Sequence, residues 1–253
     1  MQLGSTMSSF FSPSGLRPVL ISLLAACCAV PVWASPFSIS PVRIYMAPRD
    51  RATAITITND GDEELVMQAD LYNWKQKVNG EDDLVLSEDM ILSPPILKLA
   101  PKSRQVVRLA MLRPRPPGEQ LTYRLIVREI PEVKITSPDL QVQIALAFSM
   151  PVFITPTGAK RNVGCTVERT APDSVKATCE NTGNAYTQAR GFVLTSANGD
   201  KLASSDASGY ILPAAKRSFD LKRTGGKIPG GNAKLAVTHD DGVVQTFDVT
   251  VAE

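Results

Sequence analysis

The chain has 253 residues, with 27 Lys and Arg against 25 Asp and Glu, a single His and a formal net charge of +2. Hydrophobic residues make up 43% of the sequence, a share typical of a globular protein with its own core. The even charge balance argues against nucleic acid and against a charged membrane surface as partners.

Residues 1–34 have the pattern of a cleaved signal peptide. Arg17 supplies a positive charge, residues 18–26 are apolar, and Ala34 ends a cleavage site before Ser35. The apolar run is shorter than the roughly 20 residues that a membrane-spanning helix needs. We therefore predict that the mature chain begins at Ser35 and is exported.

A second interpretation of the same segment starts at Cys27. The sequence LAAC that ends there resembles a bacterial lipoprotein box, in which Cys27 would carry a lipid. The residues after Cys27 are apolar and do not form the polar tether that such proteins use. Lipidation at Cys27 is therefore the alternative to cleavage after Ala34, and intact-mass analysis distinguishes the two.

The first part of the mature chain, residues 35–155, is predicted to form an immunoglobulin-like β-sandwich. Runs that alternate apolar and polar residues, bounded by Pro, Gly, Asn and Asp, are typical of strands joined by turns. The predicted strands are 38–45, 52–59, 65–74, 91–99 with a kink at Pro94-Pro95, 105–112, 121–129 and 140–154. Short strands and turns at this spacing favour a sandwich.

The second part, residues 156–253, is predicted to be another β-sandwich. The boundary is placed at Thr155-Pro156-Thr157-Gly158, a short hinge that would leave a cleft between the two domains. The predicted strands lie near 163–168, 175–180, 190–196, 210–220, 233–239 and 243–251. The fold class is therefore all-β, with two immunoglobulin-like sandwich domains.

Two cysteines remain in the mature chain, Cys165 and Cys179. They lie in two predicted strands whose midpoint is Pro172, within the turn-forming sequence Ala-Pro-Asp-Ser. A hairpin centred there sets the two side chains opposite each other, close enough for a disulfide in an oxidising compartment. A pair of buried free thiols is the alternative. Without a C-x-x-C motif, such a disulfide is structural.

The predicted strand at 140–154 is about 15 residues long, against the usual five or six. Val142, Ile144, Leu146 and Phe148 alternate along one face of it. The residues alone leave two interpretations open. Either this face lies in the core of its own domain, or it is exposed and pairs with a partner, because such an exposed edge would otherwise aggregate. Met150 and Val152 are expected to serve the domain's own core.

The sequence gives little sign of catalysis. His239 is the one histidine, and it is followed by Asp240 and Asp241, but a single His beside a turn rarely forms a metal or catalytic site. No nucleophile elbow, zinc-protease motif or phosphate-binding loop occurs. We predict a protein that is not an enzyme and has no metal site and no cofactor.

Five segments together resemble one family. They are ISPVRIYM (39–46), ITITND (55–60), ILSPPILKLAPKSRQVVRLA (91–110), LTYRLIVREIP (121–131) and LQVQIALAFSMPVF (140–153). In this order and spacing the chain resembles the periplasmic pilus-assembly chaperones of the chaperone–usher pathway, the PapD-like family, as a divergent branch. The resemblance covers nearly all of residues 36–155 and is weak beyond residue 158.

This resemblance implies a two-domain, L-shaped chaperone in the periplasm. Its partners would be pilus subunits, which are incomplete sandwiches that lack their last strand, and an outer-membrane usher, which receives the subunits. The chaperone would lend its long strand by donor-strand complementation, with Val142, Ile144, Leu146 and Phe148 entering the open groove of the subunit. The same strand also offers the free chaperone a surface for self-association.

The resemblance assigns Arg43 a role as well. By its position in VRIY, Arg43 matches the cleft arginine that binds the terminal carboxylate of the subunit, a ligand that suits the guanidinium fork. From the residues alone, Arg43 would be a solvated strand residue.

The sequence departs from the family at the second anchor of this carboxylate. The family lysine on the donor strand is replaced by Pro151, and a basic position slightly further on is matched by Thr155. The nearby basic residues Arg128, Lys160 and Arg161 are candidate replacements, among which the sequence does not choose. Because proline removes a ladder donor, strand pairing is expected to stop or shift at Pro151.

The alternative function is an exported adhesive or structural β-sandwich module, or a surface lipoprotein. Acylation of Cys27 would favour this alternative. A gene for an outer-membrane usher or a pilin beside the gene for this chain would favour the chaperone.

Overall fold

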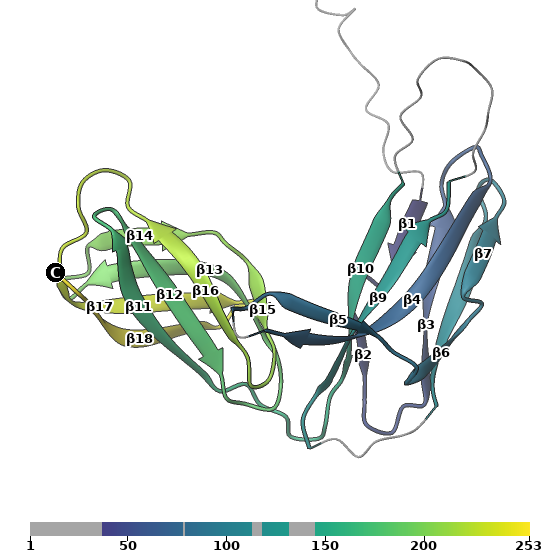
Figure 1. Cartoon of the computed structure of the whole chain (residues 1–253), viewed down its shortest axis with the longest axis horizontal. Helices are drawn as coiled ribbons and strands as arrows, with labels where there is room; N and C mark the ends of the chain where they lie inside the picture. The colour runs from purple at the N-terminus through teal and green to yellow at the C-terminus, as the bar shows by residue number, and fades with distance from the viewer. Residues whose placement is uncertain (1–36, 78, 113–117, 132–144) are drawn as a thin grey trace, which may run out of the picture. The chain divides into compact units, whose positions relative to one another are not determined.

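In the computed structural model, the described residues are 37–253 except 78, 113–117 and 132–144, and every regular element among them is a β-strand (Figure 1). The described chain therefore contains no helix of the length and hydrophobicity that crossing a bilayer requires. The strands form three sheets, two in the first region (Phe37–Ile154) and one in the second region (Val163–Val251).

The two sheets of the first region enclose one hydrophobic cluster. One sheet has the order β1 (Phe37–Ser40), β3 (Ala52–Asn59), β8 (Arg104–Met111) and β6 (Met90–Ser93). The other has the order β2 (Ile44–Met46), β10 (Ala147–Ile154), β9 (Leu121–Glu129), β4 (Leu65–Gln76) and β5 (Asp82–Leu86), with β7 (Ile96–Leu99) also paired to β4. Alternate residues of these strands are buried, for example Ile55 and Ile57 of β3, so the period of two in the sequence marks the core face.

The second region has a single sheet around a second cluster. Its order is β11 (Val163–Ala171), β12 (Ser174–Asn181), β16 (Lys216–Lys222), β14 (Lys201–Ser205), β13 (Thr187–Ser196), β17 (Gly231–His239) and β18 (Val244–Val251), with β15 (Gly209–Ile211) also paired to β13. The two layers expected of a sandwich are connected, because β14 pairs with both β13 and β16. Trp74 and Phe153 of the first region pack into this second cluster.

Three predicted strands are divided in the structure. The predicted strand 38–45 becomes β1, which pairs with β3, and β2, which pairs with β10 in the other sheet. The predicted strand 91–99 divides into β6 and β7 at the two prolines, and 210–220 divides into β15 and β16. Pro41, Pro94 and Pro213 lie at these divisions, because proline lacks the N–H that would continue the ladder.

Two strands, β5 and β14, were not predicted. Four of the five residues of β5 are exposed, so its sequence DDLVL lacks the alternation that marks a half-buried strand. In β14 the short sequence KLASS buries two consecutive residues, Leu202 and Ala203, which also breaks the period of two.

The predicted disulfide is present. Cys165 of β11 lies directly opposite Cys179 of β12, and the two sulfur atoms are bonded at 2.04 Å. The hairpin turns at Pro172-Asp173, between the paired residues Ala171 and Ser174. The turn composition in the sequence therefore located both the hairpin and the crosslink.

Removing this disulfide should lower the thermal stability of the chain. The bond closes a loop with a sequence separation of 14 residues, for which restriction of the unfolded chain contributes about 3 kcal/mol. For a protein of this size, that loss corresponds to a decrease in Tm of roughly 6–12 °C. Calorimetry of a Cys165→Ala/Cys179→Ala variant measures the effect, and an unchanged Tm would contradict it.

Candidate functional site

The backbone N–H and C=O groups of β10 point alternately toward two neighbouring strands, β9 and β2. The N–H of Glu129 donates to the carbonyl of Leu146, so residues of even number in this strand point their backbone groups toward β9. The N–H of Thr155 donates to the carbonyl of Met46, so residues of odd number point toward β2. The ladder with β9 runs without interruption from Ala147 opposite Arg128 to Ile154 opposite Leu121.

This arrangement corrects the expectation for Pro151. Pairing with β9 neither stops nor shifts there, since Pro151 lies opposite Arg124 in an unbroken register. The reason is the direction of the missing donor. The nitrogen of Pro151 is on the β2 side, where pairing begins only at Val152 with Ile44, so no bond to β9 is lost.

Because residues of odd number face the β2 side, the part of β10 that precedes β2 has an unpaired edge on that side. Ala147 and Ser149 direct their N–H and C=O groups to the β2 side, but no described strand pairs with them there. β2 occupies this side only from Val152 onward, and it runs parallel to β10. A segment that joined the edge from Ala147 to Ser149 would therefore have to end where β2 begins, beside Arg43.

The predicted donor side chains are only partly within the described residues. Val142 and Ile144 lie outside them. Leu146 and Phe148 are half-buried against the first cluster, and the ring of Phe148 meets that of Phe37 edge-on at 5.0 Å between centroids. Met150, Val152 and Ile154 are buried in the same cluster, as expected for residues that serve the domain's own core.

Arg43, immediately before β2, is held by Tyr45 of β2 and by residues of the second region. Its Nη1 donates to Asp240 Oδ2 at 2.8 Å and to Tyr45 Oη at 3.1 Å, and its Nη2 donates to Gln188 Oε1 at 2.8 Å. The side chains of Arg43 and Asp240 are 24% and 13% exposed. The guanidinium of Arg43 is thus already bonded to the carboxylate of Asp240. Partial burial strengthens this ion pair.

Aromatic side chains surround this ion pair. The hydroxyls of Tyr45 and Tyr186 are 2.6 Å apart, and the ring of Tyr186 stacks on Phe153 at 4.0 Å between centroids. Burial, together with the hydrogen bond between Tyr186 and Tyr45, raises the pKa of Tyr186, so its hydroxyl stays protonated at neutral pH. The site around Arg43 therefore combines the ion pair of Arg43 and Asp240 with the neutral hydroxyl of Tyr186.

The other basic residues considered from the sequence have partners of their own or lie apart from Arg43. Arg128 pairs with Asp70 at 3.1 Å, and Arg161 pairs with Asp241 at 2.6 Å. Thr155, matched to a basic family position, accepts a hydrogen bond from Gln120. Lys160 follows the hinge, where its backbone N–H bonds to Asn184. None of these side chains bonds to Arg43 or Tyr45 among the described residues.

Sequence reasoning missed the partners of Arg43. Asp240 and Gln188 are 197 and 145 residues away in the chain, so no local pattern links them to it. The only signal was the acidic pair that follows His239, which was considered as a metal site. Among the described residues no three metal-binding side chains lie together, and Asp240 instead faces Arg43. The predicted absence of a metal, a cofactor and catalysis stays a prediction.

His239 supports the loop that carries Asp240. It is buried, and its Nδ1 lies 2.7 Å from Thr187 Oγ1. Burial, followed by the positive charge of Arg161, lowers the pKa of His239 below its ordinary value. The imidazole is therefore neutral in the folded chain at neutral pH.

His239 should make the folded chain less stable in mild acid. The folded state binds this proton more weakly than the unfolded chain, whose His pKa is about 6.5, so the free energy of unfolding falls as the pH drops below about 6.5. Above that pH the contribution is complete. We expect the loss of Tm between pH 7.5 and pH 5.5 to be smaller in His239→Gln than in wild type. Equal losses in both proteins would contradict this role.

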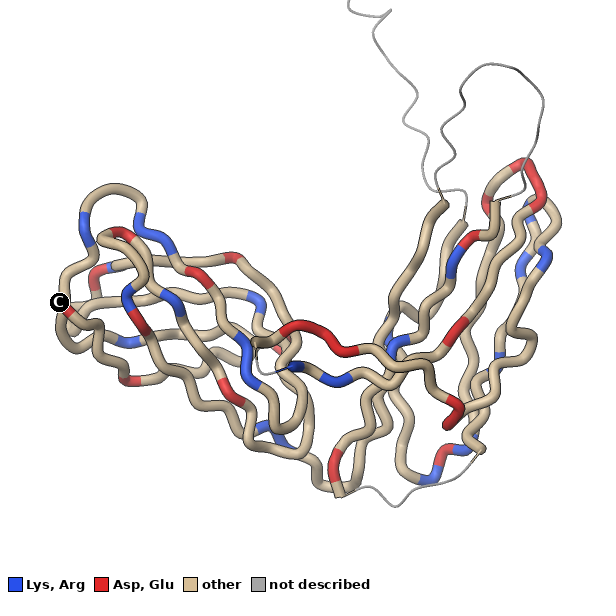
Figure 2. Tube along the Cα trace, viewed as in Figure 1, with Lys and Arg blue, Asp and Glu red and all other residues tan. Residues whose placement is uncertain are grey.

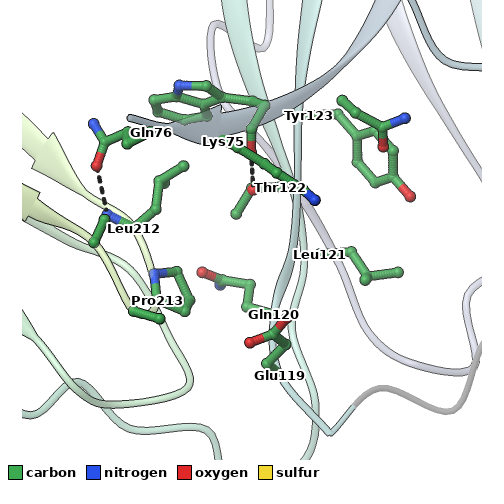
Figure 3. A pocket seen from close by; sticks show the side chains of 13 residues that line it. Lys75, Gln76, Glu119, Gln120, Leu121, Thr122, Tyr123, Leu212 and Pro213 are labelled. Atoms are coloured by element: carbon green, nitrogen blue, oxygen red, sulfur yellow. Dashed lines mark hydrogen bonds between the residues drawn. The ribbon is translucent and has the colours of Figure 1, made fainter. Parts of the chain in front are cut away.

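A cavity of about 350 Å³ lies near this site and is lined by both regions (Figure 3). Two of its polar side chains, the amides of Gln76 and Gln120, already have partners. Gln76 donates to the carbonyl of Tyr210 and accepts from the N–H of Leu212, while Gln120 donates to Thr155 and accepts from the N–H of Tyr186. These amides act as structural connections between segments far apart in the sequence.

Comparisons with known proteins place the first region in a family. Residues 36–160 match the family of pili and flagellar-assembly chaperones, PapD N-terminal domain. No curated protein sequence matches the chain.

Several solved structures have a similar fold. The CsuC–CsuE complex of chaperone and tip adhesion subunit from the Csu pili of Acinetobacter baumannii matches with a TM-score of 0.63 and 20% identity, over 87% of this chain and 100% of the other. The E. coli chaperone DraB matches with a TM-score of 0.52 and 20% identity, over 86% and 95%. The Salmonella enterica complex of the SafA pilin with the SafB chaperone matches with a TM-score of 0.53 and 13% identity, over 88% and 98%. The all-β, two-domain fold of these chaperones is thus the fold of this chain, and its residues 36–160 belong to the PapD N-terminal domain family of pilus-assembly chaperones.

Proposed function

We propose that the chain is a periplasmic chaperone that holds pilus subunits by strand addition to β10 and passes them to an outer-membrane usher. The family assignment supports the chaperone role. Two of the structures with a similar fold are complexes, one with a tip adhesion subunit and one with a pilin. Export with cleavage after Ala34 and the division into domains 35–155 and 156–253 are parts of the same proposal.

The observation that carries this proposal is the free edge of β10 that ends at Arg43. A subunit segment that ran parallel to β10 along Ala147 and Ser149 would place its C-terminus where β2 begins. An antiparallel segment would place its N-terminus there, next to a cation. Since a guanidinium binds a carboxylate, the parallel direction is the one that Arg43 favours.

Arg43 then exchanges one carboxylate for another. In the free chain Nη1 of Arg43 is bonded to Asp240, and a subunit carboxylate that takes the same nitrogen replaces Asp240. Tyr45, which is 55% exposed, lies beside this position with its hydroxyl on Arg43. We assign the second donor to the hydroxyls of Tyr45 and Tyr186, which take the place of the family lysine that Pro151 replaces.

The apolar residues of the donor segment supply the binding energy. Each large side chain that becomes fully buried contributes roughly 1.5–3 kcal/mol before ordering costs. Leu146 and Phe148 are half-buried in the free chain, so they gain less than this on binding. Val142 and Ile144, by the alternation in the sequence, continue the same face. The strand also provides a route for self-association of the free chaperone.

Co-expression tests the proposal. The chain is produced with a pilin encoded beside an usher gene, and the periplasmic fraction is analysed by native mass spectrometry. We expect a one-to-one complex of chaperone and subunit. A folded chain that binds none of the pilins would contradict the proposal and favour an adhesive or structural module.

A further inference from the structure

A second free edge lies at the opposite end of the same sheet, on β5. The N–H of Lys77 donates to the carbonyl of Glu81, and the N–H of Ser87 donates to that of Leu71, so residues of odd number face β4. Asp82, Leu84 and Leu86 therefore direct their N–H and C=O groups away from β4. No strand among the described residues pairs with that side.

The side chains of this edge are apolar and exposed. Leu84, Val85 and Leu86 are 38%, 60% and 62% exposed. Proteins usually protect such an edge with a lysine, a proline or a bulge, because an unpaired apolar strand recruits other chains. β5 contains neither lysine nor proline, and its register with β4 is regular. From Leu84 to Leu86 the edge therefore carries no charged side chain, proline or bulge.

Acidic residues flank these three apolar side chains. Glu81, Asp82 and Asp83 precede them and Glu88 and Asp89 follow, while no Lys or Arg occurs from residue 79 to residue 97. Figure 2 shows a run of acidic residues at the start of β5.

Cations near this edge compensate part of its charge, and Asp89 accepts a hydrogen bond from Tyr123. Lys77 is 3.8 Å from Glu81 and Arg124 is 3.7 Å from Asp82, both beyond hydrogen-bonding distance. The short strand β5 therefore combines acidic residues, exposed apolar side chains and unpaired backbone groups.

We propose that the β5 edge is a docking site for an extended segment of a protein partner, which adds to it as a strand. The partner segment carries apolar residues at alternate positions and Lys or Arg at its ends, because these match the exposed apolar residues and the acidic flanks of β5. A second copy of this chain is a poorer match, since it would bring acidic flanks against acidic flanks. This site is independent of β10 and of Arg43.

A pair of synthetic peptides tests the proposal on the full mature chain. The cationic probe is acetyl-KTVTVTK-amide and the control is acetyl-ETVTVTE-amide, both with a fluorophore for anisotropy. We expect the cationic peptide to bind at least ten times more tightly than the acidic one, with an affinity that falls as salt is added. Binding should also slow hydrogen exchange at the amides of Leu84 and Leu86.

Two variants locate the site. Leu86→Pro removes an outward N–H and leaves the ladder with β4 intact, so we expect the affinity for the cationic peptide to fall at least tenfold with little change in Tm. Val85→Lys adds an edge lysine without removing any backbone group and should have the same effect. The matched control is Ile96→Thr, which changes a residue that is 59% exposed on β7 and should leave the affinity unchanged.

Each result of these experiments either supports the β5 site or overturns it. Selective binding of the cationic peptide that is lost in Leu86→Pro and Val85→Lys supports the β5 site. Equal binding of both peptides, no binding of either, or binding that survives both variants overturns it. Concentration-dependent dimers of wild type that Val85→Lys abolishes would also overturn it, because they would make a second copy the occupant.

Discussion

An Arg43→Gln variant is expected to bind the pilus subunit at least about a hundredfold more weakly than the wild-type chain. The glutamine cannot form the charge-assisted hydrogen bonds that the guanidinium makes to a carboxylate, each of which contributes roughly 1.5–3 kcal/mol. Titration of the refolding subunit with purified chaperone gives the affinity, and native mass spectrometry gives the yield of the complex.

The control for this prediction is Asp240→Asn. Both variants break the ion pair between Arg43 and Asp240, but only Arg43→Gln removes the cation. If the cation binds the subunit carboxylate, Asp240→Asn retains the complex or tightens it, because the internal competitor has lost its charge. If Asp240→Asn weakens binding as much as Arg43→Gln does, the ion pair serves to join the two regions, and carboxylate binding by Arg43 is contradicted.

The second large effect is expected for Ser149→Pro. Ser149 directs its N–H to the free side of β10, so proline there removes a donor from the incoming strand and leaves the bonds to β9 in place. Pro151, two residues further along, already shows that this side of the strand accepts proline. We expect no subunit complex in native mass spectrometry and a Tm close to that of wild type.

The matched control is a proline on the other edge of the sheet. Leu86→Pro on β5 also removes one outward N–H, so it carries the same kind of backbone change at a distance from β10. We expect Leu86→Pro to keep the subunit complex. Loss of the complex in both variants would point to a general effect of edge prolines, whereas retention in both would remove the free edge of β10 from the mechanism.

Much of the fold follows from local sequence patterns. The strands β3 and β9 have the predicted bounds, since each alternates apolar and polar residues between clear turn residues. The pair of Cys165 and Cys179 followed from a hairpin centred on Pro172. Where one predicted strand serves two sheets, as at β1 and β2, the pattern continues through the division and does not reveal it.

The site was predictable only in part. Arg43 and the β10 segment were found through the family resemblance, because their motifs are local. The partners of Arg43 come from a distant part of the chain, and Asp240 gave no sign of its role. The effect of Pro151 was mispredicted for a related reason: the side to which its nitrogen points depends on the pairing of β10 with β9 and β2, which a single strand does not specify.

The most direct test of strand addition is amide hydrogen exchange at Ala147 and Ser149, measured by NMR in the free chain and in the complex with the subunit. In the free chain these two amides face an unpaired edge, while those of Phe148 and Met150 face β9. If the subunit adds to β10 as a strand, we expect exchange at Ala147 and Ser149 to slow strongly in the complex and exchange at Phe148 and Met150 to change little. Unchanged exchange at Ala147 and Ser149 in a stable complex would show that the subunit binds elsewhere.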